Sequence, residues 1–111
     1  MNSYNLIVLL KEIAIMLENN EHPGQAKYVS ALATVAEWDE IAVVPGLTSG
    51  AMWGGSGSVF DVAQFRSRDD HKKFLRLLLQ LIEEMRQRGI TTGGADFAAN
   101  AIASWLESGI I

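Results

Sequence analysis

The sequence predicts an all-α protein, an antiparallel bundle of four to five helices with an ordered glycine-rich loop. Apolar residues recur at three- and four-residue spacing in several segments, and turn-forming residues separate those segments. The chain of 111 residues has the size of one domain, so residues 1–111 are expected to form a single helical domain. Isolated helices of this length are marginal in water, and each must therefore pack its apolar face against the others.

The first two expected helices run from Ser3 to about Glu18 and from about Gly24 to Trp38. Pro23 suits the first turn of the second helix, because its missing N–H would have no helical partner there. The inward face of that helix is expected to contain Tyr28, Val29, Leu32, Val35 and Ala36.

The pattern breaks over residues 40–58, which are apolar at first and then rich in glycine and serine. Almost no charge interrupts this stretch, whereas a disordered linker needs low hydrophobicity and high charge. We therefore expect an ordered loop that is pinned by Met52 and Trp53. A short helix over Val59 to Phe65, seeded by Ser58, is expected to follow.

Two further helices are expected in the second half of the chain. Ser67 is a candidate N-cap for the first, which carries acidic residues at its start and arginines before the terminating Gly89. The last helix should run from about Ala95 to Ser108 and end at Gly109, with Ile110 and Ile111 folding back on the core. Its inward residues are expected to be Phe97, Ala98, Ala101, Ile102, Trp105 and Leu106.

Composition narrows the function classes. Thirteen acidic and nine basic residues give a net charge of −4, which is the wrong sign for direct binding to nucleic acid. With no cysteine, disulfides and thiolate metal sites are excluded. No apolar run approaches the length of a membrane span, and the start of the chain does not resemble a signal peptide, so a cytoplasmic protein without a membrane partner is expected.

No motif points to catalysis. The run Gly54-Gly55-Ser56-Gly57-Ser58 lacks the lysine of a phosphate-binding Walker loop, and a structural turn is the favoured interpretation. His22 and His71 have no partners at ligand spacing, and the acids beside His71 already fit a first helical turn. We therefore expect no catalytic residues, no cofactor and no metal ion.

The end of the second helix is the first candidate recognition surface. Glu37, Trp38, Asp39 and Glu40 place three carboxylates around an indole, a composition suited to a basic partner. The alternative is a half-buried Trp38 beside a solvated helix end.

A basic stretch in the second half of the chain is the counterpart of these acids. Two interpretations remain open for it, a salt-bridged surface with pairs such as Asp69 to Lys73, which is favoured, and a phosphate track. Its basic residues are Arg66, Arg68, Lys72, Lys73 and Arg76.

Residues 52–61 resemble a loop found in small bacterial proteins, in which an aromatic-Gly-Gly-x-Gly-Ser sequence precedes an acidic residue between helices. Several such proteins look like immunity proteins of contact-dependent growth inhibition or polymorphic toxin systems. The resemblance is carried by Trp53, Gly54, Gly55, Gly57, Ser58 and Asp61.

This resemblance implies an immunity protein that binds a cognate toxin and neutralises it by covering its active site. A basic nuclease, and a ribonuclease in particular, is the favoured toxin. Trp53 and Asp61 join the residues of the acidic helix end as expected partner contacts. The alternatives are a helical adaptor or regulator that self-associates through the Leu77–Met85 stripe, and a small-molecule-binding bundle with the Trp53 loop as a lid.

Overall fold

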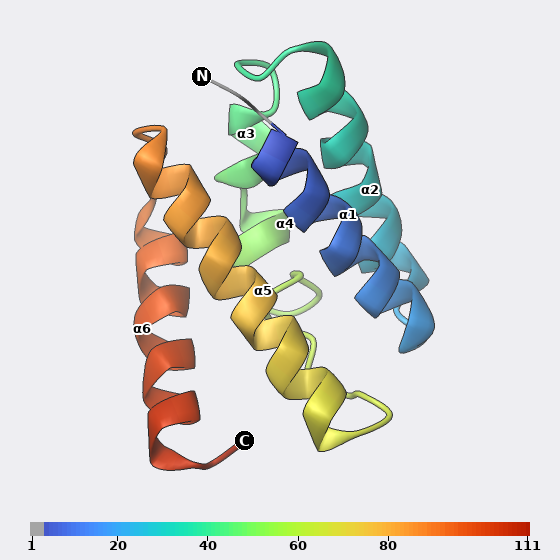
Figure 1. Cartoon of the computed structure of the whole chain (residues 1–111), viewed down its shortest axis with the longest axis vertical. Coiled ribbons are helices and arrows are strands. Elements are labelled where there is room, and N and C mark those ends of the chain that lie inside the picture. Colours follow the sequence, from blue (N-terminus) through green and yellow to red (C-terminus); the bar gives the residue numbers. More distant parts are fainter. Residues whose placement is uncertain (1–3) are drawn as a thin grey trace.

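The expected helical segments form a bundle in the computed structural model, which describes residues 4–111 (Figure 1). Four helices are long and two consist of a single turn, and no strand occurs within the described range, so the all-α fold class is confirmed. Their bounds are α1 Tyr4–Asn19, α2 Pro23–Trp38, α3 Val44–Leu47, α4 Gly50–Trp53, α5 Arg68–Gln87 and α6 Gly93–Ser108. The expected start at Ser3 lies outside the described residues.

Helix α5 is the centre of the bundle. It packs against α1 on one side and α6 on the other, while α2 packs on the far side of α1 (Figure 1). The buried face of α5 is broad enough for two neighbours, because apolar residues fill adjacent rows of the helix. These buried residues are Phe74, Leu75, Leu77, Leu78, Leu81, Ile82 and Met85.

Local capping signals confirm several helix ends. The Ser67 hydroxyl accepts a hydrogen bond from the Asp70 N–H at 3.0 Å, as an N-cap of α5 should. Pro23 is the first residue of α2. Gly89 and Gly109 both adopt positive φ after α5 and α6, the left-handed conformation that ends helices.

The glycine-rich region is ordered, and Met52 and Trp53 are both buried in it, which confirms the expected pinning. The Trp53 indole N–H donates to the Leu47 carbonyl at 2.6 Å. Gly94 of α6 lies against the base of the Trp53 side chain, since a Cβ at position 94 would be 2.8 Å from the Trp53 Cβ. The loop therefore forms part of the core.

The prediction of a helix over Val59 to Phe65 is wrong, because this segment has no helical structure. The backbone N–H groups of Val59 and Phe60 instead donate to the carbonyls of Ala51 and Met52, both at 2.9 Å. These hydrogen bonds to residues 51 and 52 take the place of the hydrogen bonds of a local helix. The side chains of Val59 and Val62 are buried in the core.

Two expected core residues also prove to be exposed. Phe97 is 68% exposed and Val35 is 37% exposed. Both helices bury faces that are rich in alanine. Because successive helical residues point about 100° apart, Val35 and Phe97 lie beside those faces and remain exposed. At the end of the chain, Ile111 packs against the core while Ile110 remains exposed.

Asn20 connects the α1–α2 turn to the segment before α5. It is buried, and its side-chain amide donates to the Met16 carbonyl at 2.9 Å and to an Asp70 carboxylate oxygen at 3.4 Å. Its carbonyl oxygen accepts from the Arg66 N–H at 2.7 Å. One side chain thus fixes the backbone at the start of α5.

No helix within residues 4–111 has the length and apolarity needed to cross a membrane.

The contact between Gly94 and Trp53 yields a stability test. Gly94→Ala places a methyl group 2.8 Å from the Trp53 Cβ, and we expect a loss of about 1–3 kcal/mol in unfolding free energy from overpacking. Gly93→Ala is the matched control, because a Cβ there meets nothing within 4 Å. Urea denaturation of both variants measures the effect, and equal stabilities would contradict the close packing of α6 on Trp53.

Candidate functional site

The end of α2 presents two large apolar side chains to solvent. Trp38 is 87% exposed and Ile41 is 80% exposed. Asp39 holds the turn between them, because its carboxylate accepts hydrogen bonds from the N–H groups of Ile41 at 2.9 Å and Ala42 at 3.3 Å. The turn is therefore structured, and Trp38 is not the half-buried residue of the alternative interpretation.

Two of the neighbouring carboxylates are engaged within the chain. Glu37 forms an ion pair with Lys11 of α1 at 3.0 Å. Glu40 forms an ion pair with Arg88, which also pairs with Glu84 at 2.9 Å. The Arg88 side chain is only 4% exposed, so it ties the turn after α2 to the end of α5. Nothing in the local sequence pointed to Arg88, because Glu40 lies 48 positions before it.

The remaining expected contacts lie elsewhere. Trp53 is 5% exposed and uses its indole N–H inside the core, so its assignment as a partner contact is wrong. A large apolar ring gains more from burial under α6 than from exposure. Asp61 is exposed, but it follows the glycine loop, whereas the α2 end lies at the top of the molecule (Figure 1). The structure thus groups residues 37–40 and separates Trp53 and Asp61 from them.

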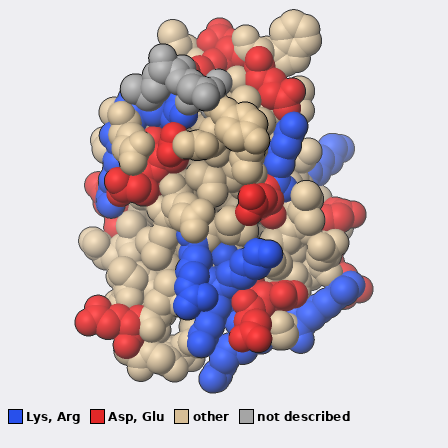
Figure 2. Space-filling model, viewed as in Figure 1, with Lys and Arg blue, Asp and Glu red and all other residues tan. Residues whose placement is uncertain are grey.

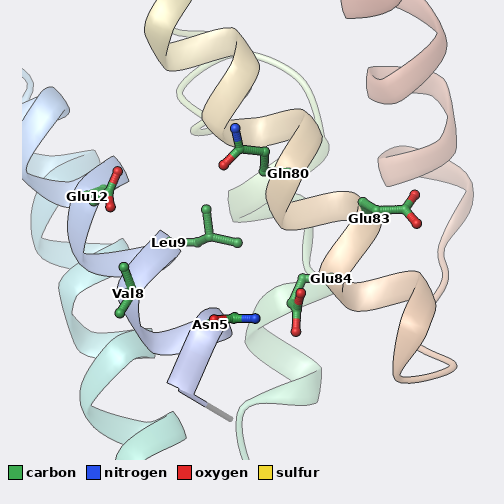
Figure 3. Close-up of a pocket in the computed structure, with 7 residues that line it drawn as sticks. All are labelled: Asn5, Val8, Leu9, Glu12, Gln80, Glu83 and Glu84. Carbon is green, nitrogen blue, oxygen red and sulfur yellow. The ribbon is translucent and has the colours of Figure 1, made fainter. Parts of the chain in front are cut away.

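A groove between α1 and α5 adds residues that the sequence did not single out (Figure 3). Its volume is about 400 Å³. Val8 and Leu9 supply apolar surface, and three glutamates surround it. The lining residues, which we call the acidic groove, are Asn5, Val8, Leu9, Glu12, Gln80, Glu83 and Glu84.

The acidic groove carries negative charge that the ion pairs of residues 4–111 neutralise only at Glu84. Glu12 and Glu83 are exposed, and neither forms an ion pair within residues 4–111. Glu84 belongs to the Arg88 network, which connects the groove to the turn after Trp38. No group of three metal-ligating side chains occurs in the described part of the chain. The arrangement suits a cationic side chain with an aliphatic stem.

The basic stretch at the start of α5 does not form the expected salt-bridged surface. Across the described residues, Asp69 and Lys73 are not within ion-pair distance, and Asp70 accepts from Asn20 instead. Figure 2 shows Lys and Arg side chains gathered in the lower half of this face. The phosphate-track interpretation stays a prediction.

Two alternative functions lose the surfaces that they require. The Leu77–Met85 stripe lies in the core of the chain, with Leu77, Leu78 and Leu81 all buried, so it cannot also serve self-association. For the alternative in which the Trp53 loop is a lid, Trp53 is 5% exposed and packs against Gly94 of α6, so its ring is not available at the surface.

No family model matches this chain, and searches of curated proteins and of solved structures found no significant match to it. The surfaces described above and the resemblance of residues 52–61 are the features of this chain that bear on function. Among those surfaces, the acidic groove and the Trp38 turn are joined by one ion-pair network.

His71 makes the unfolding free energy of the protein depend on pH. It stacks on Phe65 with ring centroids 4.7 Å apart, and burial lowers its pKa below the ordinary 6.5. The unfolded chain then binds a proton that the folded chain does not, so this residue makes stability fall as pH decreases through about 6.5, until the lower folded pKa is reached. We expect His71→Gln to lose less unfolding free energy than the unmodified protein between about pH 7.5 and about pH 5.5. Urea denaturation at both pH values measures this, and identical losses would contradict it.

Proposed function

We propose that this protein is an immunity protein, which binds a basic toxin domain and neutralises it by covering the toxin's active site. The observation that carries this proposal is the acidic groove with its exposed Glu12 and Glu83, which the Arg88 ion pairs connect to the turn after the exposed Trp38. The resemblance of residues 52–61 to immunity proteins supplies the type of partner. A nuclease is favoured, and a ribonuclease in particular, because the clefts that bind phosphates are lined with arginine and lysine.

The acidic groove matches such a partner in charge and in shape. A lysine or arginine from the toxin would lay its methylene groups on Leu9 and place its cationic end near a carboxylate of the groove. These carboxylates need no release from an internal ion pair before binding, since they form none within the described range. Opposite charges on the two partners would also accelerate association.

Trp38 and Ile41 supply the apolar part of the proposed interface. Exposed indole rings contribute much of the binding energy at protein interfaces when the partner desolvates them. The hydrogen bonds from Ile41 and Ala42 to Asp39 hold this turn in shape, so little conformational entropy is lost on binding. The buried Arg88 links this turn to the groove, and the two areas would act as one surface.

Charge reversal in the groove tests the proposal. The double variant Glu12→Lys/Glu83→Lys should weaken toxin binding by at least about a hundredfold, or roughly tenfold for each charge, while its helical content is unchanged. The partner is the product of the gene immediately upstream, and the measurements are rescue of growth on co-expression and calorimetric titration of an inactivated toxin. Glu18→Lys/Glu107→Lys is the matched control, because both glutamates are exposed and lie outside the groove.

The binding of the two double variants and of the unmodified protein distinguishes a wrong interface from a wrong function. Equal weakening by both double variants would indicate a general charge effect without a defined groove. Full binding by both would place the interface elsewhere on the chain. No complex and no rescue with the unmodified protein would overturn the immunity function.

Trp38 provides a second test of the same interface. Trp38→Ala should weaken toxin binding by about 2 kcal/mol or more, yet change unfolding free energy by less than about 0.5 kcal/mol, because the side chain is largely exposed. Ile15→Ala is the control, since Ile15 is also a large exposed residue but lies outside the groove and the turn. Calorimetry and urea denaturation give the two quantities. Binding that survives Trp38→Ala would remove the turn from the interface.

A further inference from the structure

Two adjoining cavities lie beside the segment that leads into α5, away from the acidic groove. One has a volume of about 490 Å³ and the other of about 260 Å³. They share four lining residues, Ala63, His71, Ile110 and Ile111. Small-molecule sites have volumes of roughly 300–1,000 Å³, so the pair has the size of a ligand site.

The first cavity is cationic. Arg66 and Arg68 line it, and within the described residues neither forms an ion pair. The backbone between them is held in place, because Asn20 accepts the Arg66 N–H at 2.7 Å and the Ser67 hydroxyl accepts the Asp70 N–H at 3.0 Å. Two guanidinium groups on a fixed backbone favour a carboxylate or a phosphate.

The second cavity is apolar and has aromatic walls. Phe60 and Trp105 line it with nearly parallel rings, whose centroids lie 5.9 Å apart at an interplanar angle of 9°. Leu75 and Val62 complete the wall and are buried. The Phe65 ring stacks on His71, which stands at the junction of the two cavities.

We propose that these cavities form one site for an anionic amphiphile, whose apolar body lies on Phe60 and Trp105 and whose carboxylate or phosphate lies between Arg66 and Arg68. Asp61 also lines the apolar cavity. Its negative charge repels an anionic head group there, which reinforces the orientation toward the arginines. The site is separate from the proposed toxin interface and does not depend on it.

Binding of four ten-carbon probes to the full chain tests the charge requirement. Decanoate and decyl phosphate carry an anionic head, decanol is neutral and decyltrimethylammonium is cationic. Calorimetry and tryptophan fluorescence, to which Trp105 contributes together with Trp38 and Trp53, should show saturable binding of one or both anions, at least about tenfold tighter than decanol, and none of the cation. The tighter of the two anions identifies the head group. Equal affinities for anion and alcohol, or no binding of either anion, would overturn the proposal.

Substitutions at the two cavities test where the anionic probe binds. Arg66→Ala/Arg68→Ala should weaken binding of the tighter anion at least about tenfold, whereas Lys73→Ala/Arg76→Ala removes two exposed charges outside the site and should leave it unchanged. Ala63→Trp, at an exposed residue that lines both cavities, should abolish binding by filling their junction. Circular dichroism and thermal unfolding verify that each variant is folded. Undiminished binding by Arg66→Ala/Arg68→Ala or by Ala63→Trp would place the ligand elsewhere.

The groove variant Glu12→Lys/Glu83→Lys separates this site from the toxin interface. It should retain full affinity for the anionic probe, because neither glutamate lines the cavities. A change in probe affinity in this variant would contradict the independence of the two sites.

Discussion

Burial of α5 on two sides is the constraint on which the rest of the structure depends. This helix of 20 residues must cover one side with α1 and another with α6, and its charged residues occupy what remains. The acidic groove is a consequence, because it lies where α1 and α5 meet and is lined by the half-buried Leu9 and by the exposed Glu12 and Glu83. The interface proposed for a partner therefore borders the central helix contact of the bundle (Figure 3).

Two polar side chains determine how the loops join this core. Asn20 holds the segment before α5, and Arg88 holds the turn after α2 against the end of α5. A buried ion pair adds little net stability, since desolvation of both charges offsets much of their attraction. Its effect here is positional, and it fixes where the exposed Trp38 stands relative to the groove.

Acidic and basic side chains lie on different surfaces of the molecule. Carboxylates surround the α1–α5 groove, while arginines and aromatic rings line the cavities beside the start of α5. Because most of these charged groups have no internal partner in the described chain, the low net charge conceals two surfaces of opposite sign. Each surface suits a different ligand class, a basic protein in one case and a small anion with an apolar body in the other.

The sequence alone determined the helical class, the long helices and their ends. Periodicity, the Ser67 cap and the glycines at 89 and 109 act over a few residues, so local physics decides them. Tertiary structure decided that Trp53 points inward, that residues 59–65 are not helical and that Glu40 pairs with Arg88. These outcomes depend on groups far apart in the chain, and hydrogen bonding and burial between distant segments outweigh local preference there. For the same reason the acidic turn could be read from residues 37–40, whereas the groove beside it required the packing of α1 on α5.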